Sequence, residues 1–119
     1  MLRISFDQVN LVKRDTLWEG AMKTPADCTS MAELRAEIDR LDAELVALFA
    51  ARTGFIDRAV EIKSETGLPA RIDSRVEEVV ANVRRHAVAR GLPPDKIEKL
   101  WRKLIDWSIE REEDGLGKG

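Results

Sequence analysis

The sequence is poor in the residues that most often bind metals, form disulfides or carry acid–base chemistry. Its 119 residues include one cysteine, Cys28, one histidine, His86, and no tyrosine. A single cysteine excludes a disulfide within the chain, and one cysteine with one histidine is too few for a zinc site or a Cys-His catalytic pair. We therefore expect neither a metal nor a cofactor, and any chemistry must come from arginine, lysine, glutamate, aspartate or serine.

Long apolar runs and a large excess of charge are also absent. No run approaches the roughly 18 apolar residues that a membrane span needs. The net charge of −2 gives no general attraction to nucleic acid. The first residues lack the charged start and apolar stretch of a signal peptide. We expect a cytoplasmic protein that binds neither membrane nor nucleic acid.

The chain does have a long stretch in which apolar residues recur at alternating steps of four and three. These residues are Leu34, Ile38, Leu41, Leu45, Leu48, Phe55, Ala59 and Ile62. Such a 3.5-residue repeat predicts a long helix, from about Ser30 to Ser64, that packs against other helices. Ser30 and Glu33 form a capping box at its start, and Gly67 followed by Pro69 ends it.

Two shorter helices are expected after the long one. Apolar spacing predicts a helix over about 72–90 and another from the prolines after Gly91 to about Glu113. The fold class is therefore all-α, a three-helix subunit with one long N-terminal helix. We expect an N-terminal extension or arm at 1–21, with weak strand character and an alternative start at Met22. A helical domain at 22–114 and a flexible tail at 115–119 would follow.

The lengths of the helices predict an oligomer. About 34 residues at 1.5 Å each make the first helix roughly 50 Å long, whereas each of the others is roughly 30 Å long. Two short helices cannot cover so long an apolar seam within one compact monomer. We expect the remainder of the seam to pack on a second copy in a two-fold symmetric homodimer. Trp101 and Trp107 are expected in the core or in an interface.

Arg52 stands where the next apolar residue of the seam is due. A guanidinium taken out of water needs an anionic or polar partner. Lys63 lies eleven residues further on, about 20° away on the same helical face and roughly 16 Å along the axis. The two cations can approach one anion between them, although a structural ion pair with an acid on a neighbouring helix would also explain Arg52.

Other charged and polar residues can join this cluster. Arg35 is about 25 Å from Arg52 along the helix and turned by roughly 100°, so it cannot serve the same pocket within one chain. In an antiparallel dimer it can reach the site of the partner. Arg75 follows the loop after the first helix, and Ser108 and Glu112 share one face of the third helix. Taken singly, these arginines and Glu112 are more typical of solvated surface.

Several stretches resemble the AroQ class of chorismate mutases. They are Met31-Ala-Glu-Leu-Arg-Ala-Glu-Ile-Asp-Arg-Leu-Asp42, Ala50-Ala-Arg52 and Glu61-Ile-Lys63. The preceding Lys23–Thr29 stretch resembles the opening of the related isochorismate-pyruvate lyases. The resemblance implies an intertwined homodimer of three-helix subunits, with two identical sites that bind a small-molecule substrate, either chorismate or isochorismate.

The resemblance also implies a role for each site residue. Arg35 of the partner and Arg52 would bind the two carboxylates, with Arg75 nearby, and Lys63 would contact the ether oxygen and a carboxylate. Ser108 would contact a carboxylate, and the backbone of Ile72 would contact the substrate hydroxyl. Glu112 would donate to the ether oxygen only when protonated. The catalytic set is thus Arg52, Lys63 and Glu112.

One position departs from many mutases. Val76 stands where they carry a glutamate that binds the ring hydroxyl, and this change is typical of the lyase branch. Chorismate mutase, forming prephenate by a Claisen rearrangement, is nevertheless the function that we expect. The alternatives are isochorismate-pyruvate lyase, forming salicylate, and a non-catalytic helical dimer that binds an aromatic acid.

Overall fold

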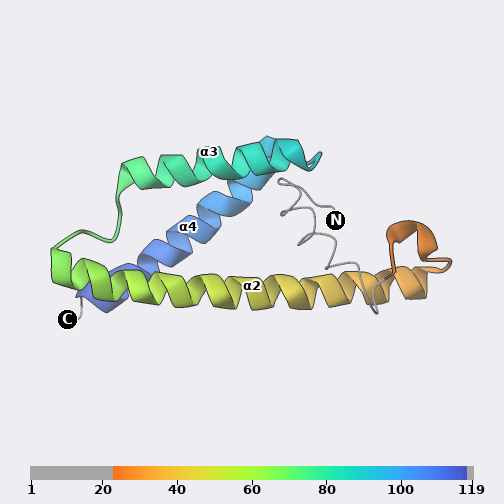
Figure 1. The fold of residues 1–119 in the computed structure, drawn as a ribbon, viewed down its shortest axis with the longest axis horizontal. Coiled ribbons are helices and arrows are strands. Elements are labelled where there is room, and N and C mark those ends of the chain that lie inside the picture. Colours follow the sequence, from red (N-terminus) through yellow and green to blue (C-terminus); the bar gives the residue numbers. More distant parts are fainter. Residues whose placement is uncertain (1–22, 118–119) are drawn as a thin grey trace, which may run out of the picture. The chain divides into compact units, whose positions relative to one another are not determined.

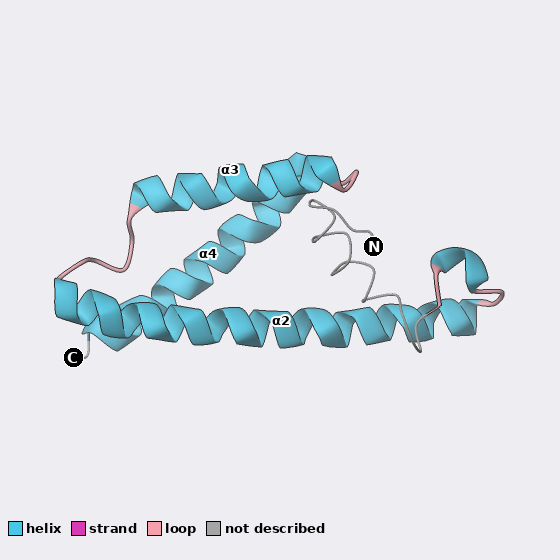
Figure 2. Cartoon of the chain, viewed as in Figure 1, coloured by secondary structure: helices cyan, strands magenta, loops and turns pink. Residues whose placement is uncertain are grey.

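The computed structural model describes residues 23–117, so the expected arm at 1–21 and the start at Met22 lie outside the described residues. One short 3-10 helix, η1, spans Pro25–Asp27, and three α-helices follow. These are α2 (Met31–Thr66), α3 (Asp73–Ala89) and α4 (Pro94–Gly117) (Figure 1). No strand occurs in this part of the chain (Figure 2), which confirms the all-α fold class.

The start of α2 is capped nearly as the capping box predicts. The backbone N–H of Glu33 donates to Ser30 Oγ at 3.1 Å. In a capping box the Glu33 carboxylate would accept the N–H of Ser30. Here it accepts the N–H of Thr29 at 2.8 Å instead. This backbone hydrogen bond, followed by the side chains of Lys23 and Thr29, lowers the pKa of Glu33.

The chain divides into two compact units, one up to Leu48 and one from Phe49 onward. The second unit contains the end of α2 together with α3 and α4, and it holds the apolar core. Val80 on α3 packs with Ile105 and Ile109 on α4, and all three are buried. Apolar residues at the edge of this cluster include Trp101, which confirms its expected place in the core.

Helices α3 and α4 form an antiparallel hairpin (Figure 1). The turn between them depends on Gly91, which has a φ of +74° that other residues rarely adopt. The N–H of Leu92 donates to the carbonyl of Ala87 at 2.8 Å, and the N–H of Gly91 donates to that of Val88 at 3.2 Å. This is a Schellman motif, which satisfies two terminal carbonyls of α3 and directs the chain back into α4.

The third helix is longer than the sequence predicts. We expected it to end near Glu113 with a flexible tail from residue 115, but α4 continues to Gly117. A Cβ atom added to Gly115 would lie 2.9 Å from Cγ1 of Val60 on α2. Glycine therefore allows α2 and α4 to approach closely here.

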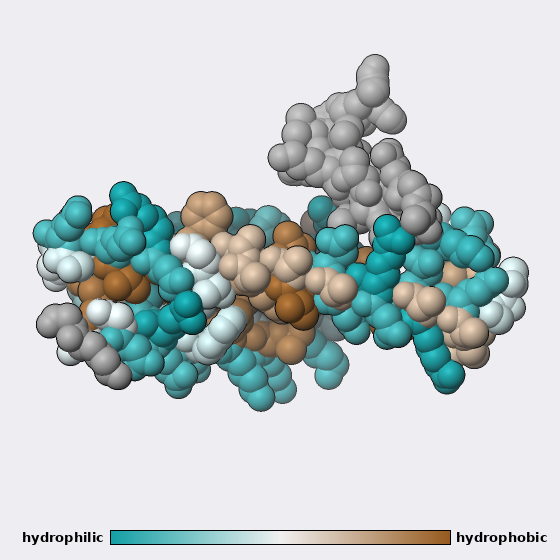
Figure 3. Space-filling model, turned by 90° about the horizontal axis from the view of Figure 1, so that it is seen from below, coloured by the Kyte–Doolittle hydropathy of each residue, from teal (hydrophilic) through white to brown (hydrophobic). Residues whose placement is uncertain are grey.

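Much of the predicted apolar seam of α2 is exposed in the single chain. The exposed fraction is 77% for Phe55 and 44% for Ile62 in the second unit, and 50% for Leu45 in the first. In the space-filling view, apolar side chains reach the surface among hydrophilic ones (Figure 3). Among the helices of residues 23–117, none is both long and apolar enough to cross a membrane.

Candidate functional site

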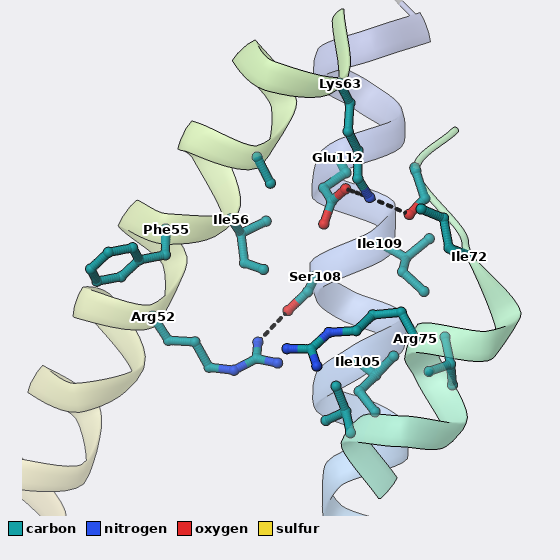
Figure 4. Close-up of a pocket in the computed structure, with 14 residues that line it drawn as sticks. Arg52, Phe55, Ile56, Lys63, Ile72, Arg75, Ile105, Ser108, Ile109 and Glu112 are labelled. Carbon is teal, nitrogen blue, oxygen red and sulfur yellow. Dashed lines mark hydrogen bonds and ion pairs between the residues drawn. The ribbon is translucent and has the colours of Figure 1, made fainter. Parts of the chain in front are cut away.

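A pocket of about 400 Å³ lies within the second unit, where the end of α2 faces α3 and α4 (Figure 4). It is lined by Arg52, Phe55, Ile56, Ala59, Lys63, Ala70, Ile72, Arg75, Val76, Val79, Ile105, Ser108, Ile109 and Glu112. The structure thus brings together every site residue predicted from the sequence except Arg35. Arg35 lies on α2 in the first unit and is not one of the residues that line this pocket.

Arg52 reaches across the pocket to α4. Its Nη1 donates to Ser108 Oγ at 2.7 Å, and that hydroxyl in turn donates to the carbonyl of Leu104 at 2.9 Å. Ser108 is buried, which fixes the acceptor in place. Within the described residues Arg52 forms no ion pair, so its partner there is the Ser108 hydroxyl and not an acid of a neighbouring helix.

A second guanidinium faces the same space. Arg75 extends from α3 toward Arg52 (Figure 4), and its Nη1 donates to Glu78 at 2.9 Å. Burial, and then the positive charge of Arg75, lower the pKa of Arg52, whereas the carboxylate of Glu112 opposes this shift. Arg52 remains charged at neutral pH because a guanidinium starts from a very high pKa. Two like charges facing one cavity favour an anion between them.

Lys63 and Glu112 form an ion pair at the other end of the pocket. Lys63 Nζ donates to Glu112 Oε1 at 2.7 Å and to the carbonyl of Ala70 at 2.8 Å. The exposed fractions of the two side chains are 16% for Lys63 and 7% for Glu112. The interpretation of Glu112 as a solvated surface residue is therefore wrong, and its burial is matched by a cation.

The charges and the apolar walls together define what the pocket can hold. Lys63 and Glu112 largely neutralise each other, so the two guanidiniums leave the cavity with a net positive charge. Ile56, Ile105 and Ile109 supply an apolar wall. This combination suits a compact ring that carries carboxylates. No group of three or more His, Cys, Asp or Glu side chains in residues 23–117 could hold a metal ion.

The remaining predicted residues lie at the entrance to α3. Ile72 is the N-cap of this helix, and its carbonyl accepts the N–H groups of Arg75 and Val76 at 2.9 and 3.0 Å. The Ile72 carbonyl is therefore already hydrogen-bonded within the first turn of α3, and these bonds fix the backbone beside the pocket. Val76 contributes an apolar side chain to the lining and also packs against the core.

Two features of the site escaped the sequence reasoning. The carbonyl of Ala70 holds Lys63, and a backbone acceptor in a loop has no side-chain signal. Arg111 on α4 binds Asp57 on α2, with Nε and Nη2 at 2.6 and 3.1 Å from the carboxylate oxygens. This hydrogen-bonded pair lowers the pKa of Asp57 and joins the helices beside Lys63 and Glu112. Only the packing of the two helices reveals it.

Comparisons with known proteins agree with this geometry. The family model described as chorismate mutase type II matches residues 34–113. The chain is 35% identical over 92 residues to the isochorismate pyruvate lyase of Pseudomonas aeruginosa, covering 76% of this chain and 89% of that protein. It is 36% identical over 84 residues to the T-protein of Enterobacter agglomerans, covering 71% of this chain and 22% of the relative.

A further relative is the bifunctional chorismate mutase/prephenate dehydratase of Aquifex aeolicus, at 28% identity over 85 residues, 69% of this chain and 24% of the relative. The chain thus spans nearly all of the lyase but only about a quarter of the bifunctional protein. The family match covers both the end of α2 and the helical hairpin that together form the pocket. The chain belongs to the chorismate mutase type II (AroQ) family.

Proposed function

We propose that this chain is a chorismate mutase, which rearranges chorismate to prephenate. The observation that carries the proposal is the pairing of Arg52 and Arg75 across one pocket, with a lysine and a carboxylic side chain at its other end. Chorismate is a compact ring with two carboxylates, so its charge and shape complement this cavity. Bidentate salt bridges from arginine are suited to such groups.

The rearrangement needs shape control rather than a covalent nucleophile. The enolpyruvyl arm must fold over the ring into a chair, and cations that bind both carboxylates hold it there. Arg52, fixed by the buried Ser108 hydroxyl, offers a guanidinium whose position is set before the ligand arrives. Fixed donors of this kind stabilise a compact transition state without reorganisation.

Lys63 is placed to stabilise the charge that develops during reaction. The breaking C–O bond leaves negative charge on the ether oxygen, and donors aimed at that atom bind the transition state better than the substrate. A lysine ammonium has three donors, and two are engaged by Ala70 and Glu112. The third can reach the ether oxygen or a ligand carboxylate. Glu112 itself would donate only as the neutral acid.

We propose that a second copy completes the site by supplying Arg35. The exposed Phe55, Ile62 and Leu45 of α2 are the surface that such a copy would cover. Arg35→Ala and Arg52→Ala variants should each lose activity and recover part of it when mixed under conditions of subunit exchange. A mixed dimer would have one site with both lesions and one with neither. Absence of rescue, with exchange confirmed, would mean that Arg35 acts in its own chain or has only a structural role.

Isochorismate-pyruvate lyase is the second candidate. Val76 presents an apolar wall where many mutases carry a glutamate, so the position of the ring hydroxyl is not selected by a carboxylate here. The 35% identity to a lyase of nearly equal length points the same way. Both reactions need the same cations, and the pocket therefore supports either substrate.

The deciding experiment gives the purified protein chorismate and, separately, isochorismate. Prephenate from chorismate would support the mutase, and salicylate with pyruvate from isochorismate would support the lyase. Turnover of neither substrate would leave a helical protein that binds an aromatic acid without catalysis.

Arg52→Gln should lower kcat/KM by about 10- to 150-fold, because a lost charged hydrogen bond is worth about 1.5–3 kcal/mol. Arg58→Gln is the matched control. Arg58 lies on the same helix, but it pairs with Glu61 at the surface and does not line the pocket. Equal losses in the two variants would contradict the assigned role of Arg52.

A further inference from the structure

The loop between α2 and α3, residues 67–72, contributes to the pocket from one side. Ala70 and Ile72 both line the cavity, and Ala70 supplies the carbonyl that holds Lys63 at 2.8 Å. The position of this loop therefore determines two things at once, the shape of the pocket wall and the direction of the lysine ammonium. Any residue that fixes the loop also fixes Lys63.

Arg71 connects the loop to α4. Its Nη2 donates to Asp106 Oδ1 at 3.1 Å, and Nη1 lies 3.9 Å from Asp73. Asp106 adjoins the buried Ile105, a core residue of the hairpin that also lines the pocket. The carboxylate thus stands on a rigid helix, whereas its partner stands on a loop. The ion pair thus joins the loop to α4.

We propose that Arg71 is a positioning residue, which latches the 67–72 loop to Asp106 and thereby holds Ala70 and Lys63 in place for the ligand. The activity readout rests on the function proposed above. When the Arg71–Asp106 pair breaks, the loop holds the Ala70 carbonyl less firmly, and Lys63 loses a fixed partner. Loss of the pair therefore weakens binding of the ligand, and it also loosens the ammonium that is aimed at the charge of the transition state.

Variants of the two members of the pair distinguish the latch from simple electrostatic attraction of an anionic substrate by Arg71. Arg71→Ala removes a positive charge near the pocket, and Asp106→Ala removes a negative one. If only the charge mattered, the first change would weaken binding of an anionic substrate and the second would strengthen it. A latch predicts that both changes weaken binding, and that the double variant is no worse than either single one.

The matched control is the ion pair of Arg102 with Glu77 on the same hairpin. Arg102 Nη2 and Glu77 Oε1 are 3.0 Å apart, and the exposed fractions of the side chains, 42% and 64%, are close to the 47% and 63% of Arg71 and Asp106. Neither residue lines the pocket. Glu77→Ala therefore removes a comparable pair without touching the loop.

The experiment measures steady-state kinetics with chorismate, or with isochorismate if that is the substrate, in the wild type and the four variants. KM should rise about two- to fivefold in Arg71→Ala, Asp106→Ala and the double variant, the range that one partly exposed ion pair supports. The kcat value should fall in the same three variants, because Lys63 is also aimed at the charge of the transition state, and Glu77→Ala should match the wild type. A lower KM in Asp106→Ala, or additive increases in the double variant, would overturn the latch.

A second measurement is independent of catalysis. The ¹⁵N order parameter of the Ala70 amide reports the mobility of the loop and should fall from about 0.85 toward 0.6 when the latch is removed. It should not change in Glu77→Ala. An unchanged order parameter in both latch variants would overturn the proposal. If the wild type turns over neither substrate, the proposed function fails, and this relaxation measurement still decides whether the latch exists.

Discussion

The Lys63–Glu112 ion pair allows a quantitative test of the site by stability alone. Both side chains are nearly buried, and Glu112, at 7% exposure, has the less water around it. Lys63→Met leaves a buried carboxylate without its cation, which costs about 3–5 kcal/mol. Glu112→Gln keeps the shape and an acceptor oxygen, and Lys63 retains the Ala70 carbonyl, so we expect a loss of only about 1 kcal/mol.

The double variant Lys63→Met/Glu112→Gln should be more stable than Lys63→Met. It contains no unpaired charge, and its unsatisfied amide and carbonyl groups cost about 1–3 kcal/mol. The two single losses sum to about 4–6 kcal/mol, so with a double-variant loss of about 1–3 kcal/mol the cycle predicts a coupling free energy of about 1–5 kcal/mol. We expect an order of stability in which Lys63→Met is the least stable variant only if this change leaves the buried Glu112 carboxylate without its ion-pair partner.

The assay is urea unfolding of all four proteins, with the free energy of unfolding extrapolated to water. Protein concentration must be equal throughout, because an oligomer is stabilised by mass action. Circular dichroism confirms that each variant is folded at the start. If both single losses are below about 1 kcal/mol and simply add, the reasoning is refuted and the two groups do not form a buried ion pair in solution.

Three further outcomes follow from contacts in the described residues. Gly115→Val should lower the melting temperature, because its Cβ would meet Val60 at 2.9 Å and overpacking costs about 1–3 kcal/mol; Val60→Ala in the same chain should restore much of the loss. Hydrogen bonds from Arg102 lower the pKa of both Glu77 and Glu98. The pairing of these carboxylates with Arg102 therefore stabilises the folded protein above the unfolded pKa of about 4.3. This stabilisation disappears as pH falls through the lower pKa that the two groups have in the folded state. Arg102→Gln should therefore destabilise the protein at pH 7 but not at a pH low enough to protonate both carboxylates. Urea unfolding at several pH values measures this. An equal loss of stability at every pH would contradict the pairing. Ser30→Ala should cost about 0.5–2 kcal/mol through the lost N-cap in thermal unfolding, whereas Ser64→Ala, near the other end of α2, should cost less.

The sequence predicts the helices well because their signals are local. The seam of α2, the cap at Ser30 and the stop at Gly67 each depend on neighbouring residues, and all three agree with the structure. The end of α4 was predicted wrongly because a glycine-rich end normally frays. Here Gly115 instead allows close contact with Val60, which is a tertiary effect with no local signal.

The candidate site was predictable in part because Arg52 interrupts an apolar seam. That anomaly, with Lys63 on the same helical face, indicates an anion site from the order of residues alone. The pairing of Lys63 with Glu112 could not be derived, since it depends on how α2 crosses α4. The carbonyl of Ala70 was invisible for another reason, because every residue has a carbonyl and only the fold decides which one faces a lysine.

The kinds of contact that hold the second unit together differ from one side to the other. Helices α3 and α4 share an apolar core. Helix α2 meets α4 mainly through charged and hydroxyl side chains at Arg52, Asp57 and Lys63, with the approach of Val60 to Gly115 as an apolar exception. Proteins open locally where few apolar contacts resist. In native-state hydrogen exchange, the amides of the hairpin should therefore exchange more slowly than those at the end of α2. The difference between the two exchange rates should widen with added salt, which screens charged contacts. The helix that carries the predicted catalytic cations is then the first part of this unit to detach, and the hairpin is the last.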